Sequence, residues 1–164
     1  MIHKNISYIE LIATILEGYA TKGVFRGFSR GTAGKSKAAF KMMWHRDRFF
    51  ELLLDVTKKT LRFPVVLPEV PARSSMYRDY QGFVESRHSG DLPEHRRINP
   101  AKARARCSYR DGNVSVTLTV LDGDFEYGAR KIVALVHETF MVFLNDGPYY
   151  DYTVEVFDLD PDKP

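Results

Sequence analysis

Residues 104–119, RARCSYRDGNVSVTLT, contain the clearest structural pattern in this sequence. Asp111-Gly112 is a dipeptide typical of the tight type I′ turn, and apolar and polar residues alternate on both sides of it. Pairing across the turn predicts an apolar face with the pairs Tyr109–Val114, Cys107–Val116 and Ala105–Leu118. The opposite face then gathers Arg104, Arg106, Ser108 and Arg110 against Asn113, Ser115, Thr117 and Thr119. We therefore expect an antiparallel hairpin with one apolar face and one basic, hydroxyl-rich face.

Three further strands are predicted upstream of this hairpin. They cover residues 38–45, 48–56 and 61–67, with turns at Arg46-Asp47 and Lys58-Lys59. A loop at Lys58-Lys59 places Val56 opposite Leu61 and Asp55 opposite Arg62. Pro64 has no N–H to donate, so we expect its strand at a sheet edge, or Pro64 at an unpaired position.

The first of these turns sets the register of an aromatic hairpin. With Arg46-Asp47 as the loop, Trp44 faces Phe49, on the side of the sheet opposite the expected core. Four residues form a candidate interface on that side: Phe40, Met42, Trp44 and Phe49. A sheet that is apolar on both faces indicates a second covering layer or a dimer interface. Exposed aromatic rings would also suit the stacking of single-stranded nucleic acid.

Three helices complete the expected architecture. Their predicted limits are Asn5 to about Ala20, Ser74 or Ser75 to Ser86, and Asp124 to about Asn145. The glycine-rich, basic residues 23–37 are expected to form a mobile loop, and residues 87–102 a long connection. Residues 149–157 fit a helix or a strand, and residues 158–164 are expected to form a frayed acidic end.

The resulting fold class is α+β, a single domain over residues 1–164. The element order is α-β-β-β-α-β-β-α, with a mostly antiparallel five-stranded sheet packed by helices. This order, over roughly residues 5–145, resembles the type III secretion chaperone-like fold. The resemblance implies a protein that dimerises and binds segments of other proteins.

Composition narrows the cellular setting. The single cysteine, Cys107, cannot form an intramolecular disulfide. The apolar run Ile6–Leu16 is interrupted by Glu10, and we interpret it as an amphipathic helix, not a signal peptide. No stretch approaches the ~18 apolar residues that a membrane span requires. We therefore expect a cytoplasmic protein with no membrane association.

Charge is distributed unevenly along the chain. The total of +3 combines a basic middle, residues 21–110, with an acidic C-terminal third, residues 111–164. Such asymmetry fits a surface that binds polyanions, and it fits equally two parts that attract each other within a chain or across a dimer.

No motif specifies a reaction. Gly34-Lys35-Ser36 lacks the glycine five residues earlier that a phosphate-binding loop needs, because Ser29 stands there. His137-Glu138 lacks a second histidine four residues on, so the two-histidine zinc pattern of a metalloprotease is absent. We expect neither a metal nor a cofactor. The remaining candidates for acid–base catalysis are Glu94, His95 and His137. The candidates for anion binding are Arg87, Arg96, Arg97, Arg104, Arg106 and Arg110.

Three functional hypotheses follow. The favoured one is a non-enzymatic, chaperone-like protein-interaction module that acts as a homodimer. The second is binding of nucleic acid or another polyanion through the arginine-rich hairpin and the 87–102 connection. The third is an enzyme acting on an anionic small molecule, with His95 as the acid or base.

Overall fold

The computed structural model describes residues 2–45 and 48–157 of the chain. Helix α1 (Ile2–Thr21) precedes four strands: β1 (Arg26–Ala33), β2 (Lys37–Trp44), β3 (Arg48–Asp55) and β4 (Thr60–Leu67). Helix α2 (Met76–Ser86) and a 3₁₀ turn (Glu94–Arg96) lead to β5 (Ala103–Arg110) and β6 (Asn113–Val120). The chain closes with α3 (Phe125–Glu138), a π-helical segment (Thr139–Leu144) and α4 (Tyr150–Phe157).

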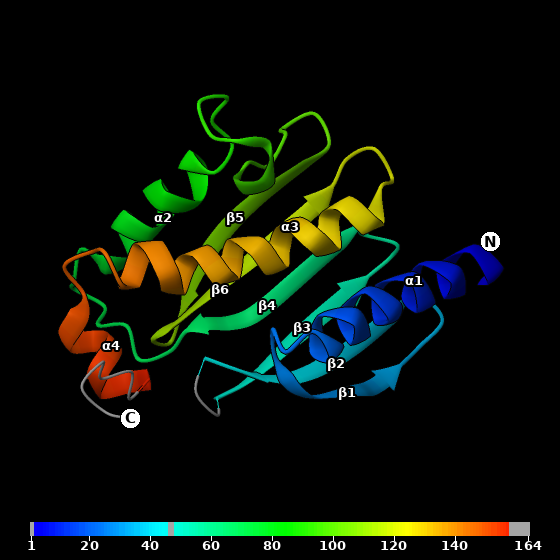
Figure 1. Ribbon diagram of the computed structural model, residues 1–164, viewed down its shortest axis with the longest axis horizontal. Coiled ribbons are helices and arrows are strands. Elements are labelled where there is room, and N and C mark those ends of the chain that lie inside the picture. Colours follow the sequence, from blue (N-terminus) through cyan, green and yellow to red (C-terminus); the bar gives the residue numbers. More distant parts are fainter. Residues whose placement is uncertain (1, 46–47, 158–164) are drawn as a thin grey trace.

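The strands form one antiparallel sheet in the order β1-β2-β3-β4-β6-β5, and the helices lie on one side of it (Figure 1). The α+β class and the antiparallel sheet are confirmed, but the expected five strands and their element order are wrong. The additional strand is β1, which occupies the region expected to be a mobile basic loop. Its glycines hide any alternating pattern, and its pairing with β2 and the Arg30–Glu10 ion pair of 2.7 Å hold it in place.

The hairpin formed by β5 and β6 has the predicted register. Tyr109 pairs with Val114, and the basic and hydroxyl-bearing residues share the opposite face. Asp111 and Gly112 both adopt positive φ, 52° and 84°, as a type I′ turn requires.

The register expected for the β2–β3 hairpin is wrong by one residue. Trp44 pairs with Arg48, not with Phe49. Because a slip of one residue moves every side chain to the other face, the proposed outward-facing interface is reversed. Phe40, Met42 and Trp44 lie in the core at 0, 0 and 6% exposure, and of the four candidates only Phe49, 71% exposed, faces outward.

The next hairpin is displaced by two residues, which preserves the faces. Leu54 pairs with Leu61, and Asp55 with Thr60 in place of the expected Arg62. Strand β4 lies inside the sheet, between β3 and β6, so Pro64 does not mark an edge. Pro64 instead stands at an unpaired position: pairing with β3 ends at Arg62, and the register with β6 shifts after Phe63.

The helices follow the predicted amphipathic patterns, with different ends. Helix α1 begins at Ile2, so Asn5 lies inside it and is not its N-cap. Asp124 does cap α3, because its carboxylate accepts a hydrogen bond from the Tyr127 N–H at 3.0 Å. Residues 149–157 were expected to form a helix or a strand, and the structure shows helix α4 at 150–157. The predicted acidic end, residues 158–164, and the turn at Arg46-Asp47 lie outside the described residues.

Side chains from the α2 region bind the outer edge of β5. The Ala105 N–H donates to His88 Nε2 at 3.0 Å, and His88 Nδ1 lies 3.1 Å from the Glu85 carbonyl. The Tyr77 hydroxyl donates to the Cys107 carbonyl at 3.4 Å. Two backbone groups of an edge strand therefore have side-chain partners, which also fixes the position of α2.

Gly128 provides a test of how closely α3 packs on the sheet. A Cβ at this position would lie 2.7 Å from Val120 Cγ2 and 3.1 Å from Leu61 Cδ1. Gly128→Ala should therefore lower the free energy of unfolding by about 1–3 kcal/mol through overpacking. Gly82→Ala in α2 is the control, because its added methyl meets nothing within 4 Å. It should stabilise the protein by about 0.5–1 kcal/mol in urea titrations. Equal effects of the two changes would contradict this packing.

Candidate functional site

The face of the sheet opposite the helices is the candidate site. Directly paired residues point to the same side, so the register identifies its members. One row across the strands consists of Ala39, Leu53, Arg62, Thr117 and Arg106. The neighbouring row consists of Lys37, Asp55, Thr60, Thr119 and Arg104. We call the surface made by these rows and their continuation along the strands the open face.

The β2–β3 half of the open face combines apolar side chains with balanced charges. Phe49, which pairs with Met43, and Leu53 are exposed there. Lys41 pairs with Glu51, and Lys37 forms a long ion pair of 3.9 Å with Asp55. This half of the open face carries little net charge, and it therefore offers a partner mainly apolar contact area.

The β4–β6–β5 half is basic and rich in hydroxyl groups. Arg104 and Arg106 pair with Thr119 and Thr117, and Arg62 lies on the other side of Thr117. The hydroxyl groups of Ser108 and Ser115 are 2.6 Å apart. Guanidinium and hydroxyl groups in this arrangement can bind carboxylate or phosphate oxygens.

Two of these arginines have no counter-charge within residues 2–45 and 48–157. Arg104 lies 3.4 Å from Glu85, and Arg110 lies 3.8 Å from its neighbour Asp111. Arg62 and Arg106 are exposed, and neither forms an ion pair with any described residue. Of the anion-binding residues predicted from sequence, Arg106 fits that role best, whereas Arg62 escaped notice because its own strand gives it no basic neighbours.

Arg62 also joins two hollows in the open face. One, of about 430 Å³, is lined by Lys37, Leu53, Asp55 and Lys58 together with Arg62. The other, of about 220 Å³, is lined by Pro64, Ser108, Arg110 and Ser115 together with Arg62. A side chain or chain segment resting on Arg62 would therefore contact both halves of the open face.

The arginines of the 87–102 connection serve a different purpose. Arg87 Nη1 donates to Glu138 Oε2 at 2.6 Å, and Arg96 Nε donates to Glu138 Oε1 at 2.7 Å. Burial raises the pKa of Glu138, but the hydrogen bond and charge of Arg96, with those of Arg87, outweigh it and lower the pKa below its ordinary value. Arg87 and Arg96 are thus committed to an internal clamp, and Arg97 Nε is buried with no hydrogen-bond partner among the described residues.

The clamp around Glu138 predicts a large cost for its removal. Glu138→Ala should lower the free energy of unfolding by about 3 kcal/mol at neutral pH, since it leaves the largely buried Arg87 unpaired. The matched control is Glu126→Ala, which removes a partner of Arg130 in an exposed pair of 3.3 Å and should cost below about 0.5 kcal/mol. Urea unfolding of both variants checks the ranking, and similar losses would contradict it.

The three residues considered for catalysis do not come together in a cavity. His95 is exposed on the 3₁₀ turn, His137 is exposed on α3, and the Glu94 carbonyl accepts from Lys131 Nζ at 2.5 Å. The hollows of the open face are lined by other residues. Burial raises the pKa of Cys107 to about 11, so this thiol is protonated at neutral pH.

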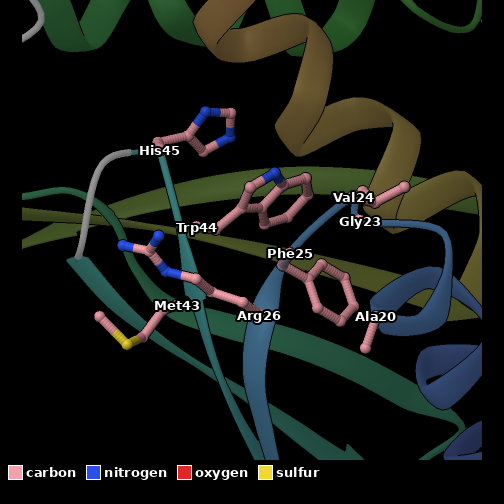
Figure 2. A pocket seen from close by; sticks show the side chains of 8 residues that line it. All are labelled: Ala20, Gly23, Val24, Phe25, Arg26, Met43, Trp44 and His45. Atoms are coloured by element: carbon pink, nitrogen blue, oxygen red, sulfur yellow. The ribbon is translucent and has the colours of Figure 1, made fainter.

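A larger hollow of about 580 Å³ lies at the end of β2, against the α1–β1 connection. Figure 2 shows the Trp44 indole between the His45 imidazole and the Phe25 ring. His45 also stacks on Phe140 with ring centroids 3.7 Å apart, and its Nε2 has no hydrogen-bond partner in the part of the chain that the structure describes. Burial, and secondarily the charge of His137, lowers the pKa of His45 to about 3. This position was not singled out from the sequence, because a lone histidine after an apolar run carries no pattern.

The buried His45 ring predicts that acid destabilises the protein. The pKa in the folded state lies below the ordinary value of about 6.5, so the unfolded state binds the proton more tightly. Stability should be complete above about pH 6.5 and fall towards pH 4.5, by up to about 1.4 kcal/mol per pH unit. His45→Phe keeps the aromatic stack and should flatten this slope in urea titrations at several pH values. An unchanged slope would show that other groups cause the acid sensitivity.

Two further classes of site find no support in the described ranges, 2–45 and 48–157. They contain no group of three or more His, Cys, Asp or Glu side chains that could hold a metal ion. No helix within them is both long and apolar enough to cross a membrane.

Comparisons of the chain with family models, with curated proteins and with solved structures give no significant match. The functional argument therefore depends on the geometry of the open face.

Proposed function

We propose that this chain is a non-enzymatic protein-binding module that acts as a dimer, and that its open face binds an acidic, partly apolar surface of a protein. One observation carries the proposal. Arg62 and Arg106 are exposed on either side of Thr117 without a described counter-charge, directly beside the exposed apolar residue Leu53.

The chemistry of the open face suits a partner with carboxylates and apolar side chains. Guanidinium groups bind carboxylates through paired hydrogen bonds, and Thr117 adds a hydroxyl between them. Leu53 and Phe49 provide apolar contact area next to the charged groups. Arginine and aromatic side chains are enriched in protein–protein interfaces.

Nucleic acid fits the same surface less well. Phosphate backbones bind best to a continuous positive surface, but Glu51, Asp55 and Asp111 are interspersed on the open face. Stacking of bases would need several exposed rings, and Phe49 is the single strongly exposed aromatic side chain on the described strands. Nucleic-acid binding is therefore treated as an alternative outcome of the test below.

The proposal agrees with the expectation from the type III secretion chaperone-like resemblance, which implies dimerisation and binding of protein segments. The chain departs from that element order by the added strand β1 and by α4. The open face, which both departures leave uncovered, remains available for binding (Figure 1).

The test is binding of a fluorescent peptide that alternates glutamate and leucine. About eight extended residues, at roughly 3.3 Å each, match the roughly 24 Å width of six strands. The wild-type protein should bind this peptide at about 50 mM salt, and Arg62→Ala/Arg106→Ala should weaken binding at least about tenfold. Anisotropy titrations measure both.

Two controls make this measurement decisive. Lys22→Ala/Lys35→Ala removes two exposed charges outside the open face and should leave the affinity unchanged. An oligonucleotide of equal charge should bind more weakly than the peptide. Tighter binding of the oligonucleotide, or equal peptide affinity of all variants, would overturn the proposal.

A further inference from the structure

A further hollow, acidic where the open face is basic, lies close to the open face. It has a volume of about 390 Å³ and is formed by α4 and the connection between β4 and α2. Tyr149 and Tyr152 line it, with the carboxylates of Glu69 and Glu155 and with the buried side chain of Met76. We call it the acidic groove.

The aromatic walls of the acidic groove are held in place. The Tyr149 hydroxyl donates to Asp79, and the Tyr152 hydroxyl donates to the Pro68 carbonyl at 2.5 Å. Tyrosine rings beside carboxylates suit a guanidinium group, which binds to carboxylate oxygens and stacks on rings. Among the described residues, neither Glu69 nor Glu155 has an ion-pair partner.

The charges of the two surfaces are matched. Segments 60–67 and 103–120, which form the basic half of the open face, carry a net charge of +3. Segments 69–79 and 146–157, which surround the acidic groove, carry a net charge of −3 even with Arg73 and Arg78 included. Each surface therefore offers what the other lacks.

The two surfaces adjoin at one end of the sheet. The Val70 N–H donates to the Gly112 carbonyl at 2.8 Å, and the Tyr109 hydroxyl donates to the Val70 carbonyl at 2.9 Å. Glu69 is thereby held beside the Asp111-Gly112 turn, next to the hollow that Arg62 and Arg110 line. A two-fold axis through this end of the sheet would place the basic patch of each copy against the acidic patch of the other, since each copy presents both.

We propose that the partner of the open face is a second copy of this chain, bound by its acidic groove. In a two-fold dimer, Arg62 and Arg106 of each copy face Glu69 and Glu155 of the other. This inference rests on the proposed function, because it names the protein that occupies the same face. In this arrangement, the acidic groove of one copy supplies the counter-charge for the basic half of the open face of the other.

The test uses reversal of charge on each surface. Arg62→Glu/Arg106→Glu and Glu69→Lys/Glu155→Lys each place like charges across both contacts, so each variant alone should be monomeric. Mixed together, the two variants restore attraction at both contacts and should form a heterodimer. Sedimentation velocity of the full chain, with wild type as the reference, measures the masses.

Salt and a matched variant control the experiment. The wild-type dimer should dissociate at least about tenfold more readily at about 500 mM than at about 50 mM salt. Lys22→Glu/Lys35→Glu changes the net charge by the same amount as the arginine variant, and it should remain dimeric. Thermal unfolding checks that every variant is folded.

The outcomes separate this inference from the proposed function. If the wild type and the mixture stay monomeric while the glutamate–leucine peptide still binds, the inference is wrong and the dimer of the proposed function fails with it, whereas binding of a different acidic protein by the open face stands. If the heterodimer forms and the peptide does not bind, the inference stands and binding of a foreign acidic segment fails. Assemblies larger than a dimer in the mixture would overturn the two-fold arrangement.

Discussion

The missing N–H of Pro64 is the constraint on which much of this architecture depends. Proline cannot donate to a ladder, yet β4 lies in the interior of the sheet between β3 and β6. The β3–β4 ladder consequently has three pairs, and the β4–β6 ladder is irregular between Phe63 and Leu67. The two halves of the sheet are thus joined by a short stretch of pairing, and rings on the helix side maintain the contact: Phe50 meets Phe63 at 6.3 Å and Phe140 at 5.9 Å.

This junction also divides the open face. The β2–β3 half of the open face is partly apolar and has balanced charges, whereas the β4–β6–β5 half is basic. Arg62 is the last residue of β4 that pairs with β3, and its side chain lines the hollows on both sides. If β3 and β4 paired beyond Pro64, regular strand pairing would occupy the place of the two hollows beside Arg62. The position of the candidate site is therefore a consequence of where the ladder stops.

The sequence predicted the fold where local chemistry was unambiguous. The Asp111-Gly112 turn admits one register, so the sequence correctly predicted which face of the β5–β6 hairpin carries the arginines. The β2–β3 turn carried no such dipeptide, and an error of one residue moved Trp44 from the core to the surface. Strand β1 was missed because its glycines contribute no alternation and its stability comes from pairing and from α1. The sequence also could not predict which arginines bind Glu138 and which have no counter-charge among the described residues, since Glu138 meets Arg87 and Arg96 only in three dimensions.

Both borders of the sheet carry features that hinder the addition of a further strand, which bears on how the molecule can associate. At one border, the pairing of β1 with β2 is irregular at two places, and Arg30 is tied to Glu10 of α1. At the other, His88 and Tyr77 occupy backbone groups of β5 that an incoming strand would need. These features hinder edge-to-edge growth, the usual route from a β-sheet to a fibril, at both borders. Such borders favour association through the side chains of the open face over pairing of the backbone at the sheet edges.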